Sequence, residues 1–482
     1  MKDNNLKNQL KVNDLILLSI KRLGINGEGI GFYKRQVVFV NNALPKEVVE
    51  VSITEANEKY VYGEVTKFKE KSKDRIDALC PYFNKCGGCQ LQHLSYKAQL
   101  VEKRNIVEEA FSKYYEGDFS KIKIYDTIGM DHPWGYRNKS SLPVRHDGEH
   151  VVFGMYAASS NKLVYIDSCP IENDKINEVR KHVMEELDKA KVDIYNPKSQ
   201  TGVLRYVVIR AFPNSKEVQV SFIMTREDQK LINVLKKLKV SSANYSINND
   251  FKSPEIFGSV VVNVAGEKQI EGKLGDLSFK ISPQAFFQLN TIQTITLYNK
   301  IKEACGLTGN ENVLDCYCGI GSIGMYLAPY AKEVRGIDVN GEGIKNAINF
   351  AKLNGIDNAR FYKGNILPHL HDFKKEGFVP DVLVVDPPRK GLELSLINYL
   401  QESNIKKIIY VSCNVATLAK NINHLKKYYN VEYIQPIDMF PQTSHVECIV
   451  GLYRKEWKWW KYIRVSRSES RSSYFVHFVH LF

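Results

Sequence analysis

The fold is indicated most clearly by the segment Asn312-Val-Leu-Asp-Cys-Tyr-Cys-Gly-Ile-Gly-Ser-Ile-Gly324. A short apolar strand ends in an acidic residue, and a glycine-rich turn then opens a helix, as in the first unit of a doubly wound α/β sheet. Helical stretches such as 343–354 separate further apolar runs that also end in polar residues. These runs are 334–338, 382–386 and 408–412. We therefore predict a parallel sheet over residues 284–455, with its ligand site beyond the carboxyl ends of the strands.

The glycine spacing alone does not identify the ligand. Residues 319–324 satisfy the dinucleotide pattern G-x-G-x-x-G, and Asp338, at the end of the next strand, can accept hydrogen bonds from ribose hydroxyls. Asp315 precedes the turn, where a carboxylate could face an ammonium group but would repel a pyrophosphate. S-adenosylmethionine (SAM) carries an amino acid and no phosphate, so the sequence favours SAM over NAD(P) and over a purely structural turn. Asp386-Pro-Pro-Arg389 is typical of methyltransferases that act on nucleic-acid bases and supports this choice.

A cysteine follows the run 408–412, in the loop before a helix. The N-terminus of a helix lowers the pKa of a thiol, so we expect Cys413 to be a reactive nucleophile. The alternative is a buried structural cysteine, the usual environment of this residue type. A later segment, Asp438-Met-Phe-Pro-Gln-Thr-Ser-His-Val-Glu447, supplies a candidate base and favours catalysis.

The chain before the predicted sheet divides into two parts. Residues 8–70 hold short β-rich runs and glycine turns interleaved with Lys and Arg, which predicts a small RNA-binding β-barrel. Residues 75–283 are strand-heavy with one clear helix near 95–113, and we predict a central α+β domain there. Residues 456–482 show no period, and we expect a disordered tail.

The composition favours a polyanionic partner and excludes a membrane span. The chain of 482 residues carries a formal net charge of +13, and phosphate binding by basic proteins is driven by the release of counterions. A basic but solvated surface is the alternative. No apolar run approaches the ~20 residues that cross a bilayer, and the polar start lacks the core of a signal peptide. We expect a cytoplasmic protein that contacts no membrane.

Nine cysteines, an odd number, argue against a secreted disulfide framework. Cys80, Cys86 and Cys89 have the spacing C-x5-C-x2-C, and Cys169 offers a fourth ligand. Four thiolates hold either Zn²⁺ or a 4Fe–4S cluster, and the spacing leaves both open. We expect four further cysteines to be packing residues: Cys305, Cys316, Cys318 and Cys448.

Three motifs in this order resemble the RNA uracil-5-methyltransferase family: Asp386-Pro-Pro-Arg-Lys-Gly391, Tyr410-Val-Ser-Cys-Asn-Val-Ala-Thr417 and the segment 438–447. The resemblance extends to about Lys455 and is closest to the 23S rRNA (uracil-5-)-methyltransferases with a TRAM domain and an iron–sulfur cluster. It implies an α/β fold, with a Rossmann-like class I SAM-dependent methyltransferase domain preceded by a TRAM- or OB-like barrel and a central α+β domain. It also shifts the four-cysteine site from zinc to a 4Fe–4S cluster with a structural role.

The resemblance assigns chemical roles to residues. It implies that the Cys413 thiolate adds to carbon 6 of uracil and makes carbon 5 nucleophilic toward the SAM methyl group. Glu447 then removes the proton from carbon 5 before the thiol is eliminated. Asp338 stands where many relatives carry Glu, with the same charge on a shorter side chain. The predicted cofactor contacts are Gln288, Tyr317, Gly319, Asp338, Asn365 and Asp386.

Three more side chains are candidates for RNA contact. A uridine in folded RNA is inaccessible, so we expect it to be extruded into the active site. Phe286 is a candidate to stack on it, with a core phenylalanine as the alternative. Arg137 and Arg389 are candidate phosphate or base contacts, and an ordinary surface charge is the alternative for each.

The sequence thus predicts a monomeric enzyme that methylates carbon 5 of a uridine in 23S rRNA. The nearest alternatives are the same reaction on tRNA and a cytosine-5 RNA methyltransferase, which places its cysteine in other motifs. An NAD-dependent oxidoreductase on the same sheet would leave Cys413 and Glu447 without a purpose. An RNA-binding iron–sulfur protein with a degenerate methyltransferase domain would not retain Cys413, Glu447 and Asp386 together.

Overall fold

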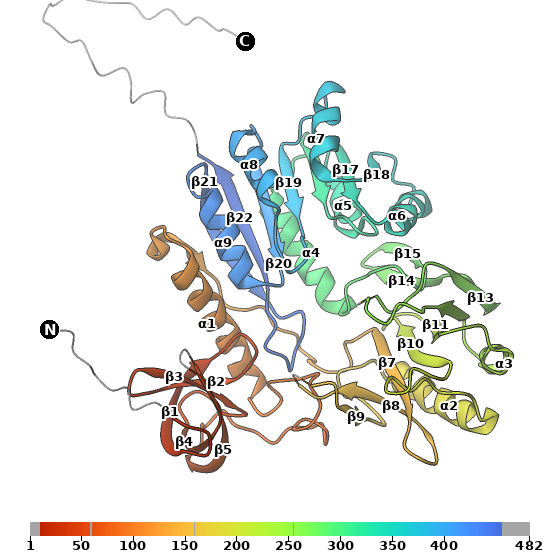
Figure 1. The fold of residues 1–482 in the computed structure, drawn as a ribbon. Coiled ribbons are helices and arrows are strands. Elements are labelled where there is room, and N and C mark those ends of the chain that lie inside the picture. The colour runs from red at the N-terminus through yellow and green to blue at the C-terminus, as the bar shows by residue number, and fades with distance from the viewer. Residues whose placement is uncertain (1–9, 58–59, 159, 254, 456–482) are drawn as a thin grey trace, which may run out of the picture.

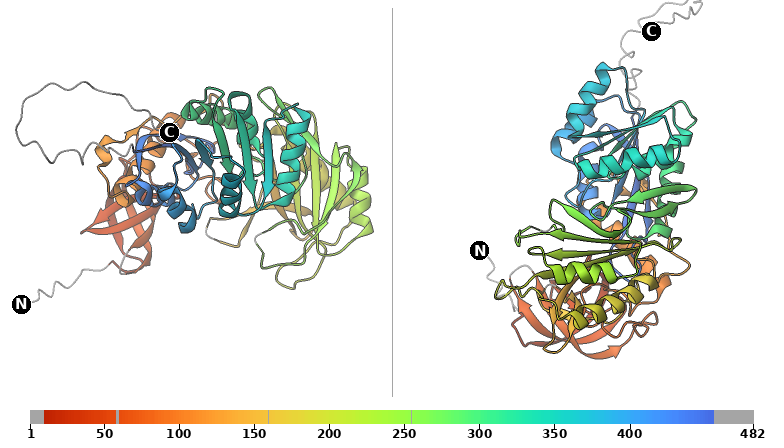
Figure 2. Two further views of the ribbon diagram at one scale, coloured as in Figure 1. Left: turned by 90° about the horizontal axis from the view of Figure 1, so that it is seen from above. Right: turned by 90° about the vertical axis from the view of Figure 1, so that its right-hand side faces the viewer.

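The computed structural model describes residues 10–57, 60–158, 160–253 and 255–455. The segment 456–482, for which the sequence predicts a disordered tail, lies outside the described residues. Figure 1 shows three parts: a small barrel, a central sheet, and a large sheet with helices on both faces. In the right-hand view of Figure 2 the large sheet stands above the other two. Within the described part, no helix combines the length and apolar character that crossing a membrane requires.

The first part is a five-stranded closed barrel, as predicted. Its strands are β1 (Leu15–Leu23), β2 (Gly29–Tyr33), β3 (Gln36–Asn41), β4 (Val48–Ala56) and β5 (Val61–Glu70). They close in the order β1-β2-β3-β5-β4. Alternation along β1 turns Ile16, Leu18 and Ile20 into the barrel core and leaves the residues between them outside. Gly27, with a φ of 88°, lies in the turn between β1 and β2 and adopts the left-handed conformation that glycine tolerates best.

The second part is a seven-stranded sheet. Its strands are β7 (Lys139–His146), β8 (Val151–Tyr156), β9 (Leu163–Tyr165), β10 (Leu204–Ala211), β11 (Val218–Met224), β12 (Ser242–Ile247) and β13 (Val261–Gly266). Their order is β13-β12-β11-β10-β7-β8-β9. The helices α2 (Asp174–Ala190) and α3 (Gln229–Lys237) share one apolar core with this sheet. A hairpin of β14 (Ile270–Leu274) and β15 (Leu277–Ile281) packs instead into a core of the third part.

The third part is the doubly wound sheet that the sequence predicts. Its strands are β16 (Asn312–Cys316), β17 (Glu333–Asp338), β18 (Ala359–Lys363), β19 (Val382–Val385), β20 (Lys407–Ser412), β21 (Tyr429–Ile437), β22 (Glu447–Arg454) and β6 (Lys123–Ile124). They run in the order β18-β17-β16-β19-β20-β22-β21-β6. Strands β16 to β20 are parallel, and β22 lies antiparallel between β20 and β21.

Helices cover both faces of this sheet, because successive strand residues point to opposite sides. Val313 packs in one core with α4 (Thr291–Cys305), α5 (Ser322–Leu327) and α6 (Gly341–Leu353). Leu314 packs in the other core with α7 (Ile366–Lys375), α8 (Leu394–Glu402) and α9 (Val415–Leu425). Two short 3₁₀ turns complete the described elements, η1 (Phe119–Lys121) and η2 (Ala328–Tyr330).

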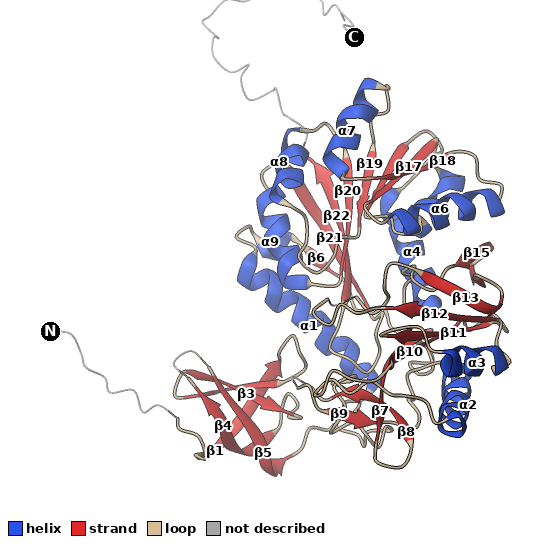
Figure 3. Ribbon diagram, turned by 45° about the vertical axis from the view of Figure 1, so that its right-hand side comes forward, coloured by secondary structure: helices blue, strands red, loops and turns tan. Residues whose placement is uncertain are grey.

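Two elements from early in the sequence join the large sheet rather than the central one. Strand β6 pairs in parallel with β21, and α1 (Tyr96–Tyr114) packs against α9 with Val107 and Phe111 in the shared core. Figure 3 shows α1 between the barrel and the helices of the large sheet. The sequence groups both elements with residues 75–283, because their partners lie far along the chain, where no local pattern reports them.

Candidate active site

The glycine turn after β16 forms an open backbone cradle. Gly319 and Gly321 have φ values of 56° and 75°, in the left-handed region. A Cβ atom on Gly321 would lie 2.5 Å from the Phe361 ring, whereas one on Gly319 would meet no atom within 4 Å. The Gly319 amide donates to Asp338 Oδ2 at 2.9 Å, and the Asn340 amide donates to Asp338 Oδ1 at 2.7 Å. Asp338 thus holds the turn in place while one side of Gly319 stays open to a ligand.

Asp315 supports the turn from within the protein. It is fully buried, and its Oδ2 accepts a hydrogen bond from the Gly324 amide at 2.8 Å. Burial, with Asp386 and Asp338 nearby, raises the pKa of Asp315 to about 8. The sequence indicates that a carboxylate at this position could face an ammonium group, and the structure places it beneath the start of α5. A strand-end pattern does not distinguish a side chain that faces the ligand from one that lies under the turn.

Two of the other predicted cofactor contacts, Gln288 and Asp386, are joined by a hydrogen bond at these strand ends. Gln288 Nε2 donates to Asp386 Oδ2 at 3.4 Å, so the loop before α4 meets the end of β19. The Gln288 carbonyl accepts from Asn138 Nδ2 at 2.8 Å, which ties this loop to the central sheet. Tyr317 is half-buried with a φ of 62°, and Asn365 is exposed at the start of α7. Their roles toward a cofactor stay predictions.

The predicted nucleophile and base lie at one edge of the large sheet. Strand β20 ends at Ser412 and β22 begins at Glu447, and the antiparallel register sets Ser412 opposite Cys448. Cys413 and Glu447 are therefore neighbours, and the negative charge of Glu447 contributes to raising the pKa of the Cys413 thiol. Glu447 is 5% exposed, and its Oε1 has no hydrogen-bond partner among the described residues. A buried, unpaired carboxyl oxygen is unfavourable for folding, which points to a functional use.

Burial raises the pKa of each acid in this site. It raises the pKa of the Cys413 thiol to about 11, with Glu447 and Asp386 adding to the rise. Burial and Asp386 raise the pKa of Glu447 well above its usual range, and burial raises that of Asp386 to about 7. The Arg389 guanidinium acts in the opposite direction on the pKa of both Cys413 and Glu447. The predicted lowering of the thiol pKa is wrong in this structure, because burial outweighs the helix N-terminus.

The loop that leads to Glu447 is anchored by α1. Lys103 and Asp438 form an ion pair in which both side chains are fully buried. Tyr96 donates its hydroxyl to Asp438 Oδ2 at 3.0 Å. Gln99 Nε2 donates to Gln442 Oε1 at 2.9 Å, and the Gln442 amide donates to Gln99 Oε1 at 3.1 Å. No local pattern predicts the role of these three residues of α1, since their partners lie more than 330 positions away.

Several separate parts of the chain, α1 among them, line a pocket over the nucleophile. The loop after β20 contributes Cys413 and Asn414, and the loop before β22 contributes His445. The turn between β1 and β2 of the barrel contributes Ile25 and Asn26. Exposed Arg389 also lines it, which places this predicted RNA contact beside the thiol. The barrel residues are part of the site that sequence reasoning missed.

Phe286 and Phe287 have opposite environments. Phe287 is 4% exposed and packs against Phe212 and Phe279, whereas Phe286 is 64% exposed. The alternative that Phe286 is a core residue is therefore wrong. Its stacking on a base stays a prediction.

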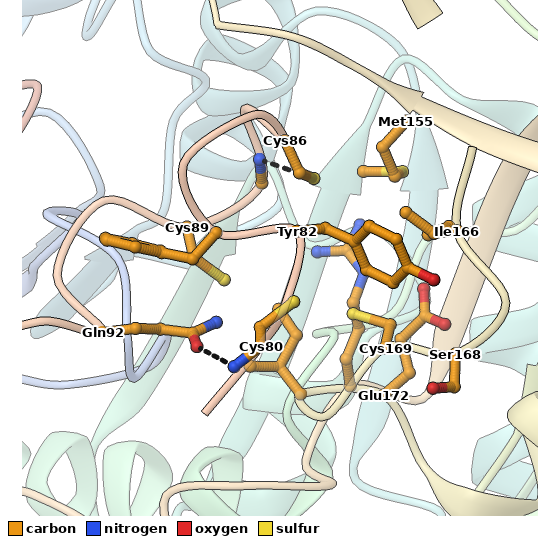
Figure 4. Close-up of a pocket in the computed structure, with 14 residues that line it drawn as sticks. Cys80, Tyr82, Cys86, Cys89, Gln92, Met155, Ile166, Ser168, Cys169 and Glu172 are labelled. Atoms are coloured by element: carbon orange, nitrogen blue, oxygen red, sulfur yellow. Dashed lines mark hydrogen bonds between the residues drawn. The ribbon is translucent and has the colours of Figure 1, made fainter. Parts of the chain in front are cut away.

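The four cysteines 80, 86, 89 and 169 line one pocket beside the central sheet, and Figure 4 shows their side chains around a common space with Tyr82 and Met155. Burial raises the pKa of Cys89 to about 11 and that of Cys169 to about 12. Arg137 lines this pocket and not the one over Cys413. Over the described residues, no three His, Cys, Asp or Glu side chains are grouped to hold one metal ion.

The remaining four cysteines 305, 316, 318 and 448 are buried, which confirms them as packing residues. Each lies in one of the two apolar cores of the large sheet. No nucleophilic role is needed to explain them.

Comparison with family models gives two matches. The model described as tRNA (Uracil-5-)-methyltransferase matches residues 95–455, and the model of the TRAM domain matches residues 9–66. The first match spans all of the third part and the central sheet. The second coincides with the barrel.

Relatives match the chain over nearly its whole length. A protein of Bacillus cereus named as an uncharacterized RNA methyltransferase is 44% identical over 454 residues, which cover 93% of this chain and 99% of the relative. A protein of the same name in Halalkalibacterium halodurans is 42% identical, over 92% of this chain and 97% of its own. Among solved structures, the tRNA (uracil-54, C5)-methyltransferase of Pyrococcus abyssi, in complex with S-adenosyl-L-homocysteine, matches with a TM-score of 0.72 and 28% identity. That match covers 91% of this chain and 100% of that one.

Proposed function

Because this chain belongs to the RNA uracil-5-methyltransferase family and carries a TRAM domain, we propose that it methylates carbon 5 of a uridine through Cys413 and Glu447. The observation that carries this proposal is the buried Glu447 carboxyl, one oxygen of which has no hydrogen-bond partner among the described residues. Its strand pairs with the strand that leads to Cys413, and Cys413 lines a pocket. The chain is a SAM-dependent RNA methyltransferase; the roles of individual residues and the RNA it modifies are the proposal.

The strand ends of the large sheet fit SAM. The open side of Gly319 lets a ligand approach the backbone, and no phosphate has to lie near Asp338 and Asp386. We assign its binding to six residues: Gln288, Tyr317, Gly319, Asp338, Asn365 and Asp386. When bound, SAM supplies an electrophilic methyl group.

Cys413 starts the reaction as a thiolate. Its sulfur adds to carbon 6 of uracil, and the electrons of the 5,6 double bond move toward O4, which makes carbon 5 nucleophilic. Ionisation of the thiol is an uphill step, because the pKa of Cys413 is raised to about 11. Arg389 lowers this pKa and so favours the thiolate. Carbon 5 then bonds to the methyl carbon of SAM while the bond from that carbon to the sulfonium sulfur breaks, and S-adenosyl-L-homocysteine is the leaving group.

Glu447 completes the reaction as the general base. Its carboxylate takes the proton from carbon 5, and the electrons of that C–H bond re-form the 5,6 double bond. The carbon–sulfur bond breaks with its electron pair returning to Cys413. The raised pKa of Glu447 makes its carboxylate a stronger base than an ordinary glutamate.

We propose 23S rRNA as the substrate, because the motifs resemble the rRNA enzymes that combine a TRAM domain with a cysteine cluster. A second candidate is tRNA. The observation that favours it is the match of the Pyrococcus abyssi tRNA enzyme over 91% of this chain. The site is surrounded by the barrel, α1 and the strand ends of one chain, which supports action as a monomer. An rRNA substrate would place that monomer in the cytoplasm.

The test is methyl transfer to unmodified RNA. Purified protein is incubated with labelled SAM and with transcripts of 23S rRNA and of tRNA, and the product is mapped by mass spectrometry. We expect 5-methyluridine at a defined position of 23S rRNA. Label in tRNA alone would select the second candidate, and 5-methylcytidine would overturn uracil as the target.

We propose that the four-cysteine pocket holds a 4Fe–4S cluster. Four cysteines from two separate segments line it, with Met155 and Ile166 as apolar neighbours. A single zinc ion binds its four thiolates at Zn–S distances of about 2.3 Å. The four thiolates of a cluster bind separate iron atoms, so their sulfur atoms lie further apart from one another. The cluster would join the segment 80–89 to the central sheet and would take no part in methyl transfer.

A further inference from the structure

The turn between β1 and β2 of the barrel is part of the wall of the catalytic pocket. Ile25 and Asn26 line the pocket together with Cys413 and His445. The Ser444 hydroxyl donates to the Ile25 carbonyl at 2.9 Å, so the turn is bonded to the loop that precedes Glu447. The TRAM barrel therefore contributes to the pocket that Cys413 lines.

This turn is held in one conformation. The Asn26 amide donates to Glu28 Oε2 at 3.0 Å, and Asn26 Nδ2 donates to Glu28 Oε1 at 3.3 Å. Gly27 fits against Gln90, whose Cβ lies 2.7 Å from where a Cβ of residue 27 would stand. The Gln90 amide in turn donates to the Gln442 carbonyl at 3.1 Å. The turn is thus fixed to the same loop at two points.

The tip of this fixed turn carries an exposed apolar side chain. Ile25 is 57% exposed, although it lies beside Cys413 in a pocket. Exposed apolar groups gain free energy when they are covered. Arg389 and His445 line the same pocket as Ile25. Their side chains can donate hydrogen bonds to the phosphates of a nucleic acid.

Extrusion of a base leaves a gap in the RNA stack at the nucleotide's former position. Proteins that distort nucleic acids insert apolar side chains between base steps, and the neighbouring bases present flat apolar faces. We propose that Ile25 is the wedge that enters this gap when the target uridine moves to Cys413, with the flanking nucleotides as its ligand. The inference rests on the proposed function, since it requires an RNA uridine at Cys413.

The test compares Ile25→Ala with Ile25→Leu and with the control Leu17→Ala. Leu17 lies on the outer face of β1 in the same barrel, is 59% exposed, and does not line the pocket. Each variant is assayed on two substrates: the folded transcript that wild-type protein methylates, and a short single-stranded oligonucleotide with the sequence around the modified uridine. Thermal unfolding midpoints equal to wild type establish that the variants are folded.

We expect Ile25→Ala to lose about tenfold in kcat/KM on the folded transcript and less than about twofold on the oligonucleotide, where little stacking opposes extrusion. Ile25→Leu keeps an apolar side chain and is expected to retain most activity on both, as is Leu17→Ala. Equal losses on both RNAs, or an unchanged rate on the folded transcript, would overturn the wedge while leaving the proposed function intact. If wild-type protein methylates neither RNA, the proposed function fails and the wedge with it.

Discussion

The pocket over Cys413 and the four-cysteine pocket both hold half-buried thiols with raised pKa values, but the carboxyl groups beside these thiols differ. Glu172 lines the four-cysteine pocket and forms an ion pair with buried Arg180. Glu447 lies beside Cys413, and one of its oxygens has no partner within the described part of the chain. A carboxylate held in an ion pair is a poor base, whereas a carboxylate without a partner can accept a proton.

The two pockets also differ in what surrounds them. Residues of the RNA-binding barrel and the exposed Arg389 border the pocket over Cys413. The other pocket is bordered by Met155, Ile166 and the ring of Tyr82. A raised thiol pKa is common to both pockets, so it is the neighbouring acid and surface that distinguish the proposed roles of the cysteines. In our proposals the Cys413 thiol of the first pocket attacks the uracil ring, whereas the thiols of the second pocket hold a 4Fe–4S cluster.

The largest expected effect is loss of the nucleophile. Replacing Cys413 by alanine or serine should lower methyl transfer at least about a thousandfold, because no other group can form the bond to carbon 6. The measurement is transfer of labelled methyl from SAM to RNA. Cys305→Ser changes a buried thiol of α4 that lines neither pocket, so it serves as the control and should retain most activity. Modification at the normal rate by Cys413→Ser would mean that the two pockets do not differ as described.

The next effect separates the first half of the reaction from the second. Glu447→Gln should lower turnover by about 10²- to 10⁴-fold, the usual contribution of a general base. Because the thiol and the methyl acceptor are intact, methylated RNA should accumulate as a covalent complex through Cys413. Denaturing electrophoresis detects that complex. Slow turnover without any complex would assign Glu447 to an earlier step.

A change in the other pocket should affect metal content more than chemistry. Cys169→Ser removes one ligand, and anaerobically purified variant protein should lose iron and the visible absorbance of the cluster. Cys305→Ser is the matched control, because Cys305 is buried outside that pocket. Equal iron content in both variants, or zinc without iron in the wild type, would contradict the proposed 4Fe–4S cluster.

The smallest effect is a displacement of the pH profile. Arg389 lowers the pKa of both Cys413 and Glu447, so both groups ionise at higher pH in Arg389→Gln. Both must be ionised to act, so activity rises with pH, and the rise should shift to alkaline pH in the variant. At neutral pH we expect a loss of about three- to tenfold, limited by the exposure of Arg389. A profile that keeps its position and only drops in height would assign Arg389 to RNA binding alone.

The sequence was sufficient for the sheet, the barrel and the cysteines that share a pocket, because strand periodicity and short spacings are local signals. It was not sufficient for the barrel turn at the active site, since the hydrogen bond between Ser444 and Ile25 joins residues 419 positions apart. The ion pair between Lys103 and Asp438 could not be predicted either, because these two residues also lie far apart in the sequence. The raised pKa of Cys413 was missed because burial depends on the whole fold, whereas the helix that follows it is a local feature.

The proposed reaction depends on a covalent bond between Cys413 and carbon 6 of a uracil, and RNA containing 5-fluorouridine can trap that bond. The fluorine on carbon 5 cannot leave as a proton does, so the reaction stops after methyl transfer with the RNA still attached. We predict a complex that survives denaturation, forms only with SAM, and yields on digestion a peptide in which Cys413 carries the methylated nucleotide. Full methylation of ordinary RNA with no such complex, or attachment through a different cysteine, would contradict the account.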